Sequence, residues 1–133
     1  MEEILRIEEL YGFKTKKDDW IDYDGFQITT TNQTIKIGIS NKQCCCESFG
    51  CIITNDKTGE FIGSELKSVS IVDESLDKKK IDELEYSDCG GAMFVDLETS
   101  KGVLQFVAYN GHNGYYGHEA VLISKQLTKS TVI

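Results

Sequence analysis

The stretch AMFVDLETSKGVLQFVAYNGHNGYYGHEAVLIS, residues 92–124, decides the fold of this 133-residue chain. In residues 93–98, Met, Val and Leu alternate with Phe, Asp and Glu, which is the two-residue period of a strand. Residues 100–102, Ser-Lys-Gly, predict a turn, and residues 103–109 are apolar at nearly every position, as in a strand covered on both faces. Residues 115–123 have a similar character. We therefore predict three neighbouring strands in the middle of an antiparallel sheet.

The N-terminal segment has a different spacing. Ile4, Ile7 and Tyr11 recur at intervals of three and four, with acidic residues between them, and Gly12 offers a stop. This pattern predicts a short amphipathic helix over residues 2–11. A helix of this length is marginal alone, so we expect its apolar stripe to pack on the sheet.

Alternation with a period of two resumes at Trp20. Residues 20–23 predict a short strand followed by a turn, residues 26–30 and 35–39 predict a half-buried antiparallel hairpin, and residues 66–72 predict a further strand. Residues 73–91 are highly polar with little periodicity, which favours a surface loop.

These elements together predict the fold class. We expect one domain over residues 1–133, of the α+β class but mainly β. Its core would be a single antiparallel sheet, strongly bent or barrel-like, with one short N-terminal helix packed against it.

The charge balance limits the possible partners. Twenty-two Asp and Glu against 14 Lys and Arg give a net charge of −8. Direct nucleic-acid binding is disfavoured, because such proteins neutralise phosphates with Lys and Arg. The expected partner is a protein, for which a basic surface would suit the acidic chain. No secretory signal and no apolar window long enough to cross a bilayer occur, so we expect a cytoplasmic location and no membrane contact.

The segment QCCCE, residues 43–47, is one place where chemistry could occur. A nucleophilic cysteine needs a depressed pKa, which a nearby histidine can provide. The catalytic candidates are therefore Cys44, Cys45 and Cys46, with His112 or His118 as base.

Zinc is a second possibility for the same residue types. The candidate ligands are Cys45, Cys51, Cys89 and His118, a set large enough for a tetrahedral site. The paired C-x2-C spacing typical of zinc sites is missing, however. We expect no metal and no cofactor.

The loop NGHNGYYGHE, residues 110–119, is the candidate recognition surface. Asn and Gly allow the backbone to turn sharply between two strands, so a plain hairpin connection would explain them. Such a turn does not require two tyrosines and two histidines, and aromatic side chains with polar tips are frequent in binding surfaces. The binding candidates are Asn113, Tyr115, Tyr116 and His118, together with Glu47 from the cysteine segment.

Three motifs carry a resemblance to a known family. They are QCCCESFG (43–50), FIGSEL (61–66) and TSKGVLQFVAYNGHNGYYGHEAVLI (99–123). Together they resemble an uncharacterised domain family of bacteriophages and prophage-bearing bacteria, over residues 26–123. The resemblance implies a small phage-associated β-rich domain without an established activity.

The chain departs from that family in three places. It has three adjacent cysteines rather than two, Glu65 stands in place of a proline, and Gly117-His118 lies where a serine is common, between Tyr116 and Glu119.

These observations favour a non-enzymatic binding module of phage or prophage origin. It would act on a host or phage macromolecule, for instance by inhibiting a basic, nucleic-acid-binding partner. Two alternatives stay open: a small thiol- or zinc-dependent enzyme that uses the cysteine cluster and a histidine, and a self-assembling structural subunit whose strand edges pair between copies.

Overall fold

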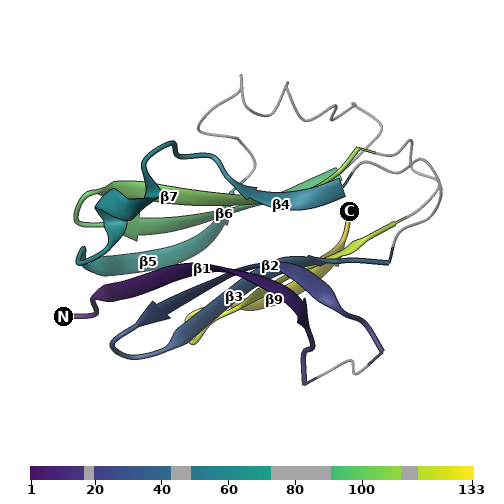
Figure 1. The fold of residues 1–133 in the computed structure, drawn as a ribbon, viewed down its shortest axis with the longest axis horizontal. Coiled ribbons are helices and arrows are strands. Elements are labelled where there is room, and N and C mark those ends of the chain that lie inside the picture. Colours follow the sequence, from purple (N-terminus) through teal and green to yellow (C-terminus); the bar gives the residue numbers. More distant parts are fainter. Residues whose placement is uncertain (17–19, 43–48, 73–90, 112–116) are drawn as a thin grey trace.

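Two antiparallel sheets are stacked face to face in the computed structural model, which describes residues 1–16, 20–42, 49–72, 91–111 and 117–133 (Figure 1). Sheet A has the order β1-β2-β3-β8-β9, formed by β1 (Ile4–Phe13), β2 (Tyr23–Thr30), β3 (Thr34–Ser40), β8 (Glu119–Ile123) and β9 (Thr128–Val132). Sheet B has the order β4-β7-β6-β5, formed by β4 (Phe49–Ile53), β5 (Leu66–Val72), β6 (Gly91–Thr99) and β7 (Gly102–Asn110).

The expected single sheet, bent or barrel-like, is therefore wrong. The described strands form two separate sheets and no closed barrel. The early hairpin is confirmed as β2 and β3, although β2 begins at Tyr23 and runs through the predicted turn at Asp24. The three C-terminal strands exist, but they are not neighbours in one sheet: β6 and β7 pair in sheet B, whereas β8 pairs with β3 in sheet A.

The predicted N-terminal helix is also wrong, because residues 4–13 form strand β1. This strand pairs with β2, and its register shifts between Ile4 and Arg6 and again between Leu10 and Phe13. Each shift breaks the two-residue alternation, so apolar residues recur at a spacing that imitates a helix. The described residues contain no α-helix; their helical element is the short 3-10 helix η1 (Thr58–Phe61).

Apolar side chains from the facing sides of the two sheets form the core. The central residues from sheet A include Ile28, Ile35, Ile37, Ile39 and Leu122, and those from sheet B include Val95, Leu97, Leu104 and Phe106. All are 0% exposed. Burial of one such side chain contributes about 1.5–3 kcal/mol, so this interlayer contact dominates the stability of the fold.

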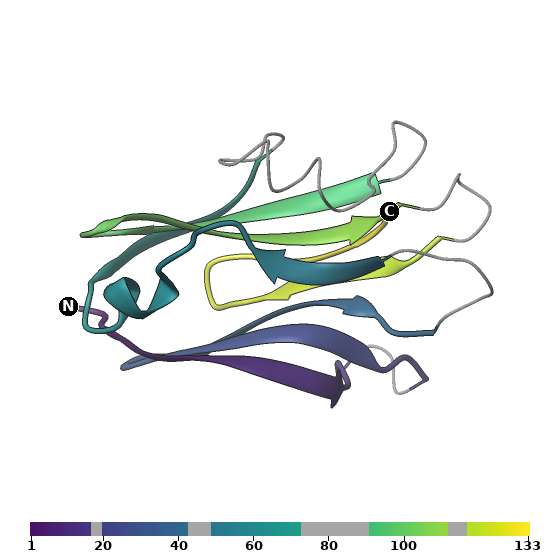
Figure 2. The same cartoon turned by 45° about the horizontal axis from the view of Figure 1, so that its top comes forward.

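Backbone hydrogen bonds join the two sheets at one end of the sandwich. The amide of Ile4 donates to Ser64 O at 2.9 Å, and the amide of Leu66 donates to Glu2 O at 2.7 Å. Near the other end, Asn110 Nδ2 of β7 donates to Ile133 O at 3.0 Å. The two ends of the chain lie at opposite ends of the sandwich (Figures 1 and 2). Hydrogen bonds therefore connect sheet A to sheet B at both ends of the sandwich.

Candidate functional site

A hollow of about 600 Å³ lies on the outer face of sheet A. Lys14, Lys16, Lys36 and Lys129 line it, together with residues of β2, β3, β8 and β9. We call it the lysine hollow. Its volume is within the range of about 300–1,000 Å³ that is usual for ligand pockets.

Strand alternation places Lys36 on this face. Its neighbours Ile35 and Ile37 are 0% exposed and belong to the core, so Lys36 between them points to the opposite side of sheet A. Across the strand pair, Lys36 is registered directly with Ile123 of β8. Directly paired residues of neighbouring strands lie side by side on one face. A charged and an apolar side chain are thus adjacent in the lysine hollow.

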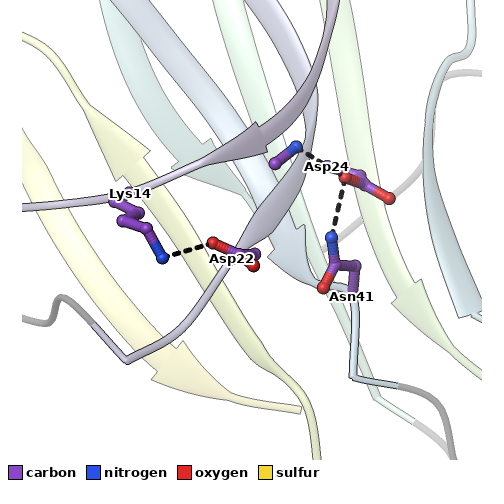
Figure 3. A network of polar contacts seen from close by, with 5 residues as sticks. Lys14, Asp22, Asp24 and Asn41 are labelled. Carbon is purple, nitrogen blue, oxygen red and sulfur yellow. Dashed lines mark hydrogen bonds and ion pairs between the residues drawn. The ribbon is translucent and has the colours of Figure 1, made fainter.

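The segment after β1 contributes Lys14 and Lys16 to the lysine hollow. Polar contacts hold the start of this segment in place (Figure 3). Lys14 Nζ donates to Asp22 Oδ1 at 2.6 Å. Asp24 Oδ1 accepts from the amide of Gly12 at 2.9 Å and from Asn41 Nδ2 at 3.1 Å. These bonds connect the end of β1 to the start of β2 and fix where the lysine-bearing segment leaves the sheet.

A small apolar cluster underlies this segment on the outer face. Phe13, Tyr23 and Val121 are all buried, and the rings of Phe13 and Tyr23 are stacked with centroids 5.5 Å apart. Lys36 Nζ lies 5.8 Å from the centroid of the Phe13 ring, close enough for a cation–π contact. Tyr23 and Val121 also line the lysine hollow, as does the half-buried Ile123. The hollow therefore has an apolar floor and a basic rim.

The local charge is opposite to that of the whole chain. Acidic residues outnumber basic ones by 22 to 14 in the sequence, whereas the lysine hollow is lined by four lysines and one carboxylate, Glu119. That carboxylate accepts a hydrogen bond from Ser130 Oγ. Asp22 forms an ion pair with Lys14, so Lys16, Lys36 and Lys129 dominate the positive charge of the hollow. Since charges are screened over about 8 Å at physiological ionic strength, a bound ligand responds to these lysines more than to acidic residues elsewhere on the chain.

His118, a predicted contact residue, is only 2% exposed. Its Nδ1 lies 2.8 Å from Ser40 O and 3.2 Å from Ser40 Oγ. Because a carbonyl oxygen only accepts, we assign the proton to Nδ1, which donates to it. The ring stacks on Phe49 with centroids 4.1 Å apart, so His118 joins the end of β3 to β4 of sheet B. Its contacts are those of a structural residue.

Cys51, one of the candidate zinc ligands, lies on β4 opposite Ala108 and packs against the core. Burial raises the pKa of its thiol to about 12. Nucleophilic attack requires the thiolate, so the form that is protonated at neutral pH does not suit it. Part of the residue borders a pocket of about 310 Å³ at the side of the sandwich, beside Glu9, Tyr11 and Asp24. There, the hydrogen bond from Tyr11 to Glu9 raises the pKa of the Tyr11 hydroxyl.

The other predicted site residues lie outside the described residues: Cys44, Cys45, Cys46, Glu47, Cys89, His112, Asn113, Tyr115 and Tyr116. The same holds for residues 73–90 of the predicted surface loop. In the part of the chain that the structure describes, no group of three or more His, Cys, Asp and Glu could hold a metal ion. That part also contains no helix long and apolar enough to span a bilayer.

Sequence reasoning did not find the lysine hollow. Its lysines come from three separate parts of the chain, positions 14 and 16, position 36 and position 129, and no motif connects them. The sequence contained one indication of the hollow: Lys36 lies on the solvent-facing side of the predicted hairpin.

Comparison with known proteins places the chain in a family but not in a functional class. No curated protein and no solved structure matches it. The sequence profile of a domain of unknown function, DUF7448, matches residues 2–122, which is most of the chain. The protein therefore belongs to the DUF7448 family.

Proposed function

We propose that this domain is a non-enzymatic binding module that binds an anionic macromolecule at the lysine hollow. The observation that carries the proposal is the segregation of charge: four lysines and one glutamate line a hollow with an apolar floor on an otherwise acidic chain. Positive charge beside apolar surface is typical of a recognition site, because complementary charge speeds encounter and apolar contact retains the ligand.

The chemistry of two candidate catalytic or metal-binding side chains supports a non-enzymatic role. His118 Nδ1 donates to a backbone carbonyl, and the ring is buried against Phe49. Cys51 has its pKa raised to about 12 by burial. A thiol enzyme needs an activated thiolate near an accessible base, and these two residues offer neither.

The location and origin of the protein belong to the same proposal. The resemblance on the Cys-Cys-Glu and Asn-Gly-Tyr-Tyr segments supports a phage or prophage origin, with action in the host cytoplasm. The lysine hollow favours an acidic partner instead of the basic one expected from the net charge. Local charge outweighs net charge at a contact surface because of screening.

A charge-reversal experiment tests the proposal. Poly-glutamate and an oligodeoxythymidine are titrated into wild-type protein, the double variant Lys16→Glu/Lys36→Glu, and the control Lys67→Glu/Lys101→Glu. The control lysines do not line the hollow and belong to β5 and the turn after β6.

We expect wild type and control to bind at least one probe, with binding weakened by salt. The hollow variant should lose affinity by about tenfold or more, equivalent to about 1.4 kcal/mol. Absence of binding to both probes, or equal losses in the two variants, would show that the proposal is wrong.

A further inference from the structure

We infer that the lysine hollow recognises a short polypeptide motif in which an apolar side chain is flanked by acidic ones. This inference rests on the proposed function and specifies the partner. Its basis is the arrangement of charged and apolar side chains across β3, β8 and β9.

The outer face is organised in rows that cross the strands. In one row, Lys36 of β3 pairs with Ile123 of β8, and Ile123 pairs with Thr128 of β9. In the adjacent row, Gly38 pairs with Val121, which pairs with Ser130. A central apolar line formed by Ile123 and Val121 therefore runs between a lysine-bearing side and a hydroxyl-bearing side.

This pattern fits a ligand with two kinds of group. A carboxylate meets Lys36 or Lys16 at the rim, while an apolar side chain one residue away lies over Ile123. Lysine stems add apolar surface to such a contact, since their methylene groups pack while the ammonium stays in water. A purely anionic ligand would leave the apolar floor unused, and a purely apolar ligand would offer no anion to Lys16 and Lys36.

A polypeptide fits better than a nucleic acid. Single-stranded nucleic acids bind through aromatic rings on which bases stack, in addition to positive charge. Among the described residues that line the hollow, Tyr23 has the aromatic ring, and it is 1% exposed and already stacked on Phe13. The half-buried Ile123 offers an aliphatic contact, which suits a Leu, Ile or Val side chain.

The test uses three capped peptides and wild-type protein. The first is Ser-Glu-Asp-Leu-Glu-Asp-Ser, the second replaces its Leu with Ser, and the third replaces every acid with the matching amide. Affinities are measured by titration calorimetry, with the oligodeoxythymidine in parallel. The protein variants are Ile123→Thr, which keeps a β-branched side chain, and the hollow and control double variants described above.

We expect the Leu peptide to bind about tenfold or more tightly than the Ser peptide. This ratio should fall towards one in Ile123→Thr, and the amide peptide should not bind. The comparison of peptides on wild-type protein remains valid even if Ile123→Thr fails to fold.

Four outcomes would overturn the inference. If Leu and Ser peptides bind equally, or if only the oligonucleotide binds, the motif is wrong while the proposed anion binding stands. If no acidic probe binds, both are wrong. If sedimentation shows a dimer that Lys16→Glu/Lys36→Glu dissociates, the lysine hollow is occupied by a second copy of the chain instead.

Discussion

The ring of Phe13 lies directly over Gly38: a Cβ atom at Gly38 would come within 2.7 Å of Phe13 Cζ. Phe13 ends β1, and Gly38 lies on β3, so the ring crosses β2 on the outer face of sheet A. The absence of a side chain at Gly38 creates the space that the ring fills. This contact supports the segment that brings Lys14 and Lys16 to the hollow.

Substitution of Gly38 tests that contact. Because a methyl group would also come within 2.8 Å of Asp24 O, a backbone atom that cannot turn away, we expect Gly38→Ala to destabilise the fold. Overpacking of this kind costs about 1–3 kcal/mol. Urea denaturation measures the loss, and Gly59→Ala is the matched control, since a Cβ there meets nothing within 4 Å. Equal unfolding midpoints for Gly38→Ala and Gly59→Ala would contradict the close packing of Phe13 on Gly38.

His118 is expected to stabilise the fold. The variant His118→Ala removes the ring stacked on Phe49 and the donor to Ser40 O. Loss of a large buried side chain and its hydrogen bond should lower the free energy of unfolding by about 2–4 kcal/mol. Val132→Ala, on a side chain that is 73% exposed, should stay within about 0.5 kcal/mol of wild type. A stable His118→Ala protein would reopen a role for this histidine in binding or catalysis.

Cys51 should be an unreactive thiol in the folded protein. With its pKa raised to about 12, roughly one thiol in ten thousand is ionised at pH 8, and only the thiolate reacts with iodoacetamide. Mass spectrometry of the Cys51 peptide should show slow alkylation in buffer and fast alkylation in urea, with free glutathione as the reference. Alkylation of the folded protein at the rate of glutathione would contradict the burial of this thiol.

Asp96 should make stability depend on pH. Burial raises the pKa of its carboxyl above 3.8, and the hydrogen bond from Gln105 Nε2 at 2.8 Å partly offsets that effect. A raised pKa means that the folded protein holds the proton more tightly than the unfolded chain does. The stabilising contribution is therefore present at low pH and is lost as the pH rises through the range just above 3.8.

The variant Asp96→Asn removes this titration and keeps an oxygen that can accept from Gln105. We expect it to be more stable than wild type at pH 7 and to lose that advantage near pH 3. The gain should be below about 1 kcal/mol, because solvent screens a carboxyl that is only partly buried. Thermal denaturation at both pH values measures this gain in stability. If the stability difference between Asp96→Asn and wild type does not change with pH, desolvation of Asp96 is not the cause of the gain.

Several strands could be read directly from side-chain alternation. Residues 66–72 form β5 as predicted, and the hairpin of β2 and β3 has the predicted apolar face, with Ile28 opposite Ile35. These predictions succeeded because a half-buried strand must alternate, and this constraint acts on neighbouring residues alone. The prediction of a helix over residues 2–11 was wrong because two register shifts in β1 remove the alternation that identifies a strand.

The sequence by itself determined the β-rich character of the domain and the position of most described strands, since local periodicity records which side chains face a core. Only the tertiary structure decided that β8 pairs with β3 and not with β7, and that lysines at positions 14, 16, 36 and 129 line one hollow. The reason is physical: strand partners are selected by contacts between distant parts of the chain, and a surface site arises only after those partners are in register.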